Sequence, residues 1–450
     1  LDLTGGTLGV ALQKGDTAGD IKVTGTVETQ KDITGLNITV DSAAGDLTVS
    51  DGTINGTVTN NRNLTLNGAG AVISGAVTNA AAGTYTITLG TQSGDVTNNG
   101  TFQVDGGLTS GSVTNSLTMN VTGGTVSGAV TNSGTINVSG TNGVAALQSV
   151  ITNTTAGIVN ILETGTLNTA AKISGGVLNI GSATVSGKTL TAGAAQIAAT
   201  TTTVFTGDTL KLNDGILGGK VTGAGTLQIS GDVEAQAIYI DATTNTVDAD
   251  KVLTLTGTNA ATDKFTKDIS GDGQVKIKAT NKVTAEAMIN TKKLLIDTGA
   301  ELYLDVDRFG SGFGDAGLEN KGTIGITANG SDEDGADVDT LKATLTGTGT
   351  YLFSAGDGKT IHANADLIKG TTNKVGTGTL DLTGGTLTVA LQKGDTAGDI
   401  KVTGTTGTVE TQKDITGLNI TVDSAAGDLK VTGGPINGTV TNNKNLTLNG

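Results

Sequence analysis

The chain has 450 residues, including 71 Gly and a single Pro but no Trp or Cys, and its formal net charge is −15. The absence of Cys excludes disulfides and thiolate chemistry. The acidic balance, with Arg62 and Arg308 as the two arginines, argues against a nucleic-acid partner, because phosphate binding needs clustered Lys and Arg. Aromatic residues make up 2% of the chain, so Val, Ile, Leu, Ala and Thr must build the core, and this composition favours β-strands.

The first seventy residues contain short alternations of apolar and polar side chains bounded by Gly, Asp or Ser. They fall at residues 8–12, 21–23, 36–40 and 47–49. Alternation with a period of two predicts half-buried strands. We expect two or three such strands in each turn of a coil.

A Val-Thr-Asn phrase then returns at a nearly constant spacing. The phrases begin at Val58, Val77, Val96, Val113 and Val130. A fixed period of this length predicts rungs that stack, with the valines in one inward column. We expect the asparagines to form a turn column beside it, because Asn tolerates left-handed backbone angles and its amide can hydrogen-bond along a stack. The prediction is an all-β parallel β-helix (β-solenoid) with rungs of about 17–21 residues.

The distribution of charge changes near residue 200. Between residues 101 and 200 the charged residues are Asp105, Glu163, Lys172 and Lys188, so the outward face there must consist of Thr, Ser and Asn. Charged residues are frequent afterwards. We interpret the later part as the same solenoid with decorated turns; the alternative is a β-sandwich between residues 230 and 350, or tandem β-sandwich domains.

The densest polar cluster is an acidic loop with alternate carboxylates around Gly335. Its candidate ligands for Ca²⁺ are Asp332, Asp334, Asp337 and Asp339. Calcium takes about 6 to 8 oxygen ligands from a flexible turn, which this pattern offers, although a solvated acidic loop has the same appearance. Two weaker candidates are Asp305 and Asp307 with Asp315, and Asp268 with Asp272.

An enzyme is not expected. Sugar-cleaving sites need paired carboxylates, or a base with cationic partners. The single histidine, His362, lies in a strand-like alternation and is interpreted as a surface or turn residue. We therefore predict no catalytic residue, no cofactor-binding residue and no required cofactor, with Ca²⁺ as the one candidate ion.

The end of the chain repeats its beginning. Residues 380–450 match residues 1–68 almost without change, apart from one small insertion. The chain is therefore predicted to hold one long unit, 1–379, followed by the start of the next unit at 380–450. Within the long unit, 1–200 is a low-charge solenoid and 201–379 has decorated turns. One unit would hold about 20 rungs and reach about 95 Å.

Three phrases carry a resemblance to a known group of proteins: residues 98–102 (NNGTF), 132–136 (NSGTI) and 320–324 (NKGTI). They resemble the turn-and-strand repeats of bacterial β-helical exoproteins, the autotransporter passenger and filamentous-haemagglutinin group. The resemblance implies an extracellular location at a bacterial cell surface and a role as a long adhesive or structural rod.

These observations predict a structural fibre, sheath or surface-layer component that assembles with copies of itself by rung stacking. The alternative is a cell-surface adhesin whose rod presents a ligand- or glycan-binding surface, expected at residues 230–350. No apolar run approaches the roughly 20 residues of a membrane-spanning helix, so no membrane span is expected.

Overall fold

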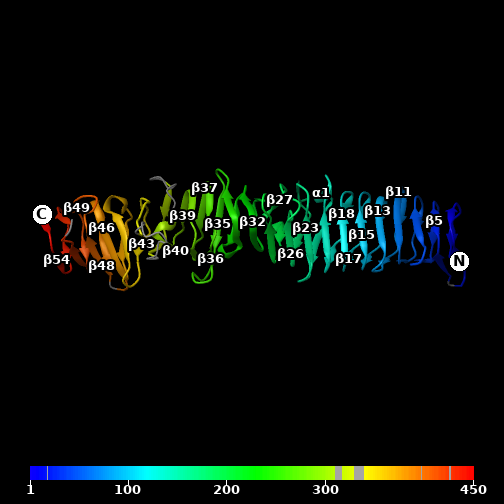
Figure 1. Ribbon diagram of the computed structural model, residues 1–450, viewed down its shortest axis with the longest axis horizontal. Coiled ribbons are helices and arrows are strands. Elements are labelled where there is room, and N and C mark those ends of the chain that lie inside the picture. The colour runs from blue at the N-terminus through cyan, green and yellow to red at the C-terminus, as the bar shows by residue number, and fades with distance from the viewer. Residues whose placement is uncertain (18, 310–316, 329–338, 397, 425–426, 450) are drawn as a thin grey trace. The chain divides into compact units, whose positions relative to one another are not determined.

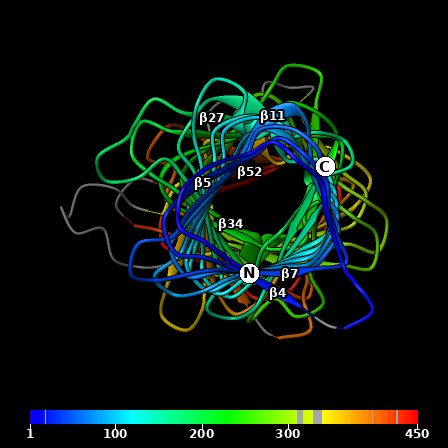
Figure 2. The same cartoon turned by 90° about the vertical axis from the view of Figure 1, so that its right-hand side faces the viewer.

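The computed structural model describes residues 1–450 except 18, 310–316, 329–338, 397, 425–426 and 450. The chain is a parallel β-solenoid of about 21 turns, with 55% of it in strands and 4% helical (Figure 1). Its contacts divide it into two units, Leu1–Leu227 and Gln228–Gly450. In Figure 2 the blue and cyan rungs of the first unit wind round a shared interior, with loops projecting outwards. The predicted fold class is confirmed.

In the first unit, eleven rungs each contribute one strand to a parallel sheet that we call sheet A. Its strands are β1 (Asp2–Leu3), β4 (Asp20–Val23), β7 (Asn37–Val40), β10 (Val58–Asn60), β12 (Val77–Asn79), β14 (Val96–Asn98), β17 (Val113–Asn115), β20 (Val130–Asn132), β22 (Val150–Asn153), β25 (Lys172–Ser174) and β28 (Ile197–Ala198).

The other strands of the first unit complete the rungs. They are β2 (Gly6–Leu8), β3 (Leu12–Gln13), β5 (Thr26–Thr29), β6 (Ile33–Thr34), β8 (Asp46–Val49), β9 (Thr53–Ile54), β11 (Asn63–Ile73), β13 (Thr84–Gln92), β15 (Thr101–Val104), β16 (Leu108–Thr109), β18 (Thr118–Val121), β19 (Thr125–Val126), β21 (Thr135–Val138), β23 (Ile158–Ile161), β24 (Gly165–Thr166), β26 (Val177–Ile180), β27 (Thr189–Gly193), β29 (Thr201–Val204), β30 (Thr209–Asn213) and β31 (Gly215–Ile216). Helix α1 (Gly143–Ala146) and the 3-10 turn η1 (Ala194–Gln196) lie between them, and β32 (Lys220–Ile229) contains the division between the units.

The second unit continues with parallel strands. One series is β33 (Val233–Gln236), β34 (Ile240–Val247), β35 (Val252–Thr256), β37 (Ile269–Ile277), β39 (Ile289–Ile296) and β41 (Leu318–Asn320). A second is β36 (Lys264–Phe265), β38 (Lys282–Ala285), β40 (Glu301–Asp305), β42 (Thr323–Thr327), β43 (Thr350–Phe353), β45 (Thr372–Val375), β47 (Leu391–Lys393), β50 (Ile415–Thr416) and β53 (Ile436–Asn437). A third is β44 (Thr360–Asn364), β46 (Gly378–Leu387), β48 (Gly398–Val402), β49 (Val409–Thr411), β51 (Asn419–Val422), β52 (Asp428–Val431), β54 (Val440–Asn442) and β55 (Asn445–Leu448), with the 3-10 turns η2 (Ala237–Tyr239), η3 (Val306–Arg308) and η4 (Ala365–Leu367) between strands.

The five Val-Thr-Asn phrases stack in register. Val58 pairs with Val77, Val77 with Val96, Val96 with Val113, and Val113 with Val130. All five valines are buried, while the threonine between each Val and Asn is exposed. The predicted inward column is therefore confirmed, and so is the predicted outward Thr face in this region.

The asparagines form a continuous buried ladder of amides, which we call the Asn ladder. Each Nδ2 donates to the Oδ1 of the Asn one rung further along. The distances are 2.7 Å for Asn60–Asn79, Asn79–Asn98, Asn98–Asn115 and Asn115–Asn132, and 2.8 Å for Asn132–Asn153. The predicted bonding along the stack is confirmed. Their position differs from the prediction, because the side chains point into the core from strand ends rather than standing in the turns.

Rung length varies more than predicted. Val96 pairs with Val113 one rung away, whereas Ile324 pairs with Tyr351, so the later rung is longer by roughly ten residues. Rungs longer than 21 residues occur in both units, as in the pairings of Ile173 with Ile197 and of Ile324 with Tyr351, so the predicted upper limit of about 21 residues is too short. With about 21 turns in the whole chain, one sequence repeat holds about 18 rungs rather than about 20.

The β-sandwich alternative for residues 230–350 is wrong. Strands β37 and β39 pair in parallel, and so do β40 and β42. A sandwich of hairpins would require antiparallel neighbours. The decorated part is therefore a continuation of stacked rungs.

The two sequence copies adopt the same register. In the first copy Asp2 pairs with Lys22, and in the second Asp381 pairs with Lys401. The second copy follows β44 in the same parallel sheet, with Ile361 paired to Leu380. The expected boundaries at 200 and 379 stay predictions, since the contacts divide the chain elsewhere, at Leu227.

The Asn ladder generates a stability prediction. Replacing Asn115 by Asp puts a carboxylate opposite the Oδ1 of Asn132, removes the donated hydrogen bond and buries a charge. We expect Asn115→Asp to lower the free energy of unfolding by about 3 kcal/mol or more. Thr114→Asp adds the same residue on the exposed side of the same strand, and we expect a loss of about 0.5 kcal/mol. Urea unfolding of both variants is the measurement; equal losses would contradict the ladder.

A second stability prediction concerns two turns of one shape. Thr280 has φ of 64°, and Gly299 at the matching place in another turn has φ of 79°. Side chains with a β-branch are strained at such angles, so Thr280→Gly is expected to raise the free energy of unfolding by about 1 kcal/mol. The nearest atom to a Cβ added at Gly299 lies 4.0 Å away, so Gly299→Thr is expected to cost about as much through backbone strain alone. Thermal unfolding measures both; changes of the same sign would refute this assignment.

Candidate functional site

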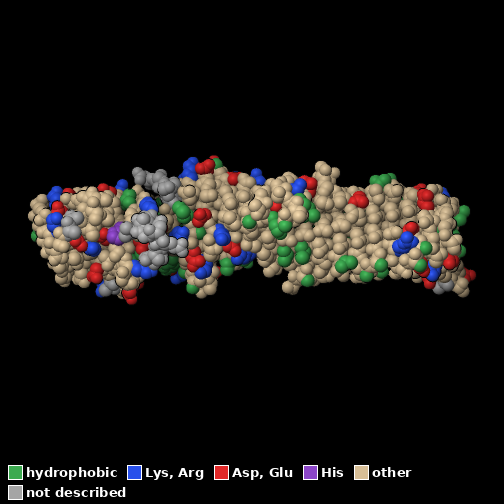
Figure 3. Space-filling model, viewed as in Figure 1, with side chains coloured by type: hydrophobic (Ala, Val, Ile, Leu, Met, Phe, Trp, Pro, Cys, Tyr) green, Lys and Arg blue, Asp and Glu red, His purple; other side chains and the backbone are tan. Residues whose placement is uncertain are grey.

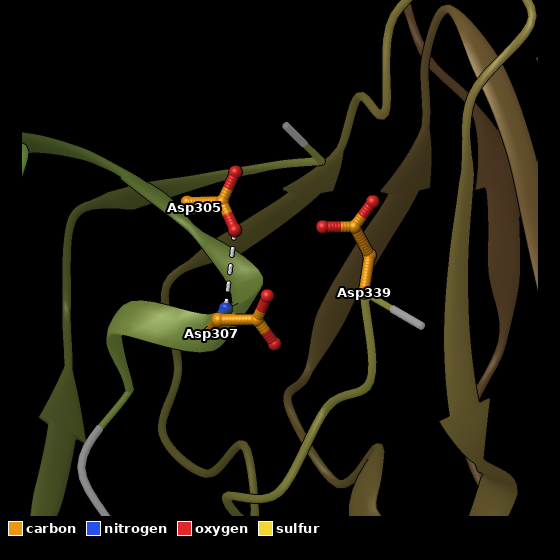
Figure 4. Close-up of side chains that lie close together, drawn as sticks. All are labelled: Asp305, Asp307 and Asp339. Atoms are coloured by element: carbon orange, nitrogen blue, oxygen red, sulfur yellow. Dashed lines mark hydrogen bonds between the residues drawn. The ribbon is translucent and has the colours of Figure 1, made fainter. Parts of the chain in front are cut away.

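Three carboxylates from different parts of the second unit meet beside the 3-10 turn η3. One oxygen each from Asp305, Asp307 and Asp339 lies within 4.8 Å of the others. Figure 4 shows Asp339 reaching towards the turn that carries the other two. Asp305 Oδ1 accepts a 3.2 Å hydrogen bond from the backbone N–H of Asp307, which caps η3 and fixes the first carboxylate. Asp339 is buried, and the other two are half-buried.

The structure brings together residues that belong to two separate candidates in the sequence. Asp339 is part of the predicted calcium loop, and Asp305 and Asp307 are part of a weaker candidate. Asp332, Asp334 and Asp337 of that loop, and Asp315 of the weaker candidate, lie outside the described residues. The calcium prediction for the loop therefore stays a prediction.

The donor set of this cluster has a definite chemistry. Carboxylate oxygens are hard ligands of the kind that Ca²⁺ prefers, and it takes about 6 to 8 of them. Three carboxylates supply up to six oxygens, but one oxygen of Asp305 is already engaged by the turn. The cluster thus fits part of a coordination shell.

Burial raises the pKa of Asp305 from its ordinary value of 3.8 to about 6. This pKa includes the neighbouring charges of Asp339 and Asp307, which act in the same direction as burial, and the N–H of Asp307 and the charge of Arg308, which act in the opposite direction. At neutral pH the ionised form of Asp305 is therefore held in the folded chain at a cost in stability.

The third predicted pair, Asp268 and Asp272, does not form a cluster of this kind. Asp268 Oδ1 accepts a 2.9 Å hydrogen bond from the N–H of Met288, and the carboxylate thus caps a turn. Within the described residues, the Asp305–Asp307–Asp339 group is the one set of three His, Cys, Asp or Glu side chains at metal-binding distances.

Asp272 instead lines a groove in the surface of the second unit, which we call the Lys/Asp groove. It consists of two adjoining hollows of about 230 and 370 Å³ that share Asp272 and Lys292. The groove is lined by Asp250, Lys251, Val252, Ser270, Gly271, Asp272, Gly273, Gln274, Asn290, Thr291, Lys292 and Lys293. Figure 3 shows many charged side chains over the second unit, whereas the region of β13 to β18 presents almost none on the face turned to the viewer.

The single histidine pairs with a buried carboxylate. His362 lies in strand β44, and its Nδ1 is 2.7 Å from Oδ2 of Asp381, whose side chain is 1% exposed. Thr403 donates from its Oγ1 and its backbone N–H to the same carboxylate, at 2.9 and 3.1 Å. His362 is thus a half-buried strand residue that holds a carboxylate, and no turn residue. The lack of catalytic residues stays a prediction.

Sequence reasoning did not find the partners of Asp305, His362 or Asp272. Each contact joins different rungs, and rungs in this unit differ in length. Asp305 pairs with Thr327 in the next rung, and the place of Asp339 beside Asp305 depends on the length of the rung that follows, which no sequence pattern marks. For His362, the signal was present, since Asp381 lies at the start of the segment that repeats from Leu380, and the residues before that segment must form the preceding rung.

None of the family models, curated proteins or solved structures compared with the chain matches it. The fold nevertheless defines a class: the chain is a β-solenoid protein, and its architecture is compatible with that of a β-helical protein. Among the described residues, no helix is both long and apolar enough to cross a lipid bilayer.

The raised pKa of Asp305 generates a prediction for the pH dependence of stability. Between pH of about 4 and 6 the folded chain holds the Asp305 proton more tightly than the unfolded chain, so the free energy of unfolding falls as pH rises through this window. We expect Asp305→Asn to be more stable than wild type by about 1–2 kcal/mol at pH of about 7.5, after allowance for partial exposure, and about equal at pH of about 4. Thermal unfolding of both proteins across this range measures the difference. A constant difference at all pH values would contradict the assignment.

Proposed function

We propose that the protein is a structural component of an extracellular fibre, sheath or surface layer on a bacterial cell, in which tandem copies of one long solenoid unit continue each other by rung stacking. The observation that carries this proposal is the junction at residue 380. There the second sequence copy continues the same parallel sheet as the end of the first sequence copy, through β44, β46 and β48.

Burial at the junction supports continuity. Leu1 is 67% exposed, whereas its counterpart Leu380 is fully buried beneath the preceding rung. Leu387 and Leu391 are likewise buried, while Leu8 and Leu12 are partly open. Burying each leucine stabilises the fold by about 2 kcal/mol. The start of one sequence copy is therefore stabilised by the end of the copy before it.

The polar contact at the junction agrees with the apolar ones. Asp381 is buried, and a buried carboxylate is costly without partners. One partner, His362, comes from the rung before the repeat, and the other, Thr403, from the rung after it. The buried polar group at the junction therefore has hydrogen-bond partners on both sides, as expected inside a continuous stack of rungs.

A second candidate function is favoured by one observation, the Lys/Asp groove. It lies at residues 250–293, inside the section where an adhesin would display its binding surface. A solenoid that forms a fibre can also bind a ligand along its side, so the two functions are compatible.

The structural proposal predicts the appearance of recombinant proteins that contain one, two and three tandem copies of residues 1–379. We expect electron microscopy to show unbranched rods that lengthen by about 85 Å for each added copy, because about 18 rungs stack at about 4.8 Å each. A two-copy protein with a flexible Gly/Ser insertion before residue 380 is the control and is expected to bend there. Compact beads on flexible linkers in the uninterrupted proteins would overturn the proposal.

A further inference from the structure

The Lys/Asp groove is built by a local feature of strand β37. The ladder between β37 and β39 is irregular between Gly271 and Gln274, which pushes Asp272 outwards. A Cβ added at Gly271 would clash with the backbone oxygen of Val247, and one added at Gly273 would clash with that of Asp248, so both positions require glycine. Asp272 thus lies at an irregular point of the strand, where the close approach of neighbouring backbone requires a glycine on each side of it.

Three successive rungs supply the other polar groups. Val252 pairs with Gln274, and Gln274 pairs with Lys293, so these positions lie side by side across the stack. Lys251 and Lys292 flank this row, and Asp250 stands in the turn before β35 with φ of 60°. The side chains of one groove therefore repeat at the rung spacing of about 4.8 Å.

The groove lysines differ from their neighbours in their partners. Nearby lysines form salt bridges of 2.7 to 3.1 Å, in the pairs Lys276–Asp297, Lys278–Glu234 and Lys282–Glu301. Lys251, Lys292 and Lys293 form none with the residues that the structure describes, and neither do Asp250 and Asp272. Nearby lysines are thus used within the fold, while the charges of the groove are left for solvent or a ligand.

The balance of these groups indicates the chemistry of that ligand. Three ammonium groups against two carboxylates make the lining net positive on a chain of net charge −15. Such a local reversal attracts anions. Ionised carboxylates accept hydrogen bonds and donate none, so Asp250 and Asp272 need donors on the ligand. Val252 is the one apolar residue among the lining side chains, so the groove offers no apolar pocket for peptide side chains.

We propose that the Lys/Asp groove binds a linear acidic polysaccharide, with its carboxylates on Lys251, Lys292 and Lys293 and its hydroxyls on Asp250, Asp272 and Gln274. The units of an acidic polysaccharide carry closely spaced hydroxyls that donate and accept hydrogen bonds. They also carry carboxylates, which the lysines attract. The inference rests on the second candidate function, and the structural role of the solenoid stands whether or not the groove binds a glycan.

The test uses the full chain and a fluorescent oligogalacturonate, with binding followed by anisotropy at low and high salt. We expect saturable binding that weakens about tenfold or more at high salt, because exposed charges are screened. The triple substitution Lys251→Gln, Lys292→Gln and Lys293→Gln is expected to weaken binding at least about tenfold. The matched control, Lys264→Gln, Lys278→Gln and Lys282→Gln, makes the same change of charge outside the groove and is expected to bind within about twofold of wild type.

The double substitution Asp250→Asn and Asp272→Asn separates a glycan from other polyanions. It makes the groove more positive, so it is expected to tighten binding of poly-glutamate of matched charge. It is expected to weaken binding of oligogalacturonate, since each carboxylate is replaced by an amide that accepts hydrogen bonds from hydroxyls through one oxygen and without charge assistance. Circular dichroism and urea unfolding establish that each variant is folded.

Absence of oligogalacturonate binding by wild type would overturn the proposal, and so would equal loss in the control triple variant. Tighter oligogalacturonate binding by the Asp250→Asn and Asp272→Asn double variant would show that the groove attracts anions through its positive charge alone. If wild type binds poly-glutamate as tightly as oligogalacturonate, the ligand class is an acidic peptide instead. None of these results bears on whether tandem copies form rods, so a failure of this inference and a failure of the structural proposal can be told apart.

Discussion

The structure depends on one constraint: every strand must pair in parallel and in register with the strand one rung away. Because side chains of equivalent positions then stack directly, each residue in a column must pack or bond with the equivalent residues of the rungs on either side. Branched apolar side chains meet this condition by contact, as in the column of Val58, Val77 and Val96. The Asn ladder meets it with amides, since each has both a donor and an acceptor to offer its two neighbours. A single misplaced group therefore disturbs the rungs on both sides.

The same constraint gives the solenoid its functional character. Each rung contacts mainly its neighbours, so a stack has no natural size, and its last rung always presents strand edges and core side chains. The junction at residue 380 shows how these are covered, with Leu380 buried and Asp381 held between His362 and Thr403. The surface is free to vary at the turns, where added residues do not disturb the pairing. The Lys/Asp groove lies instead at an irregularity within strand β37, between Gly271 and Gln274.

The structural features that the sequence predicted well are those that recur at a regular spacing. The features that it did not predict lie where rung length changes. The Val and Asn columns followed from the recurrence of five identical phrases, because a nearly constant step places equivalent residues one above another. The parallel fold of residues 230–350 remained open against a β-sandwich, since the rungs there are longer and unequal and no phrase recurs in them at a regular spacing. The meeting of Asp305, Asp307 and Asp339 was missed for the same reason. Contacts between rungs can be predicted from the sequence only when the length of each rung is known.

The most direct test of this account is amide hydrogen exchange along the chain, with attention to residues 376–404. If the second copy continues the stack, the amides of β46 and β48 exchange as slowly as those of sheet A around β14 and β17, because all lie between two paired neighbours. Rapid exchange across residues 376–384, between two protected stretches, would show that the repeats are separate bodies joined by a linker and would contradict the account.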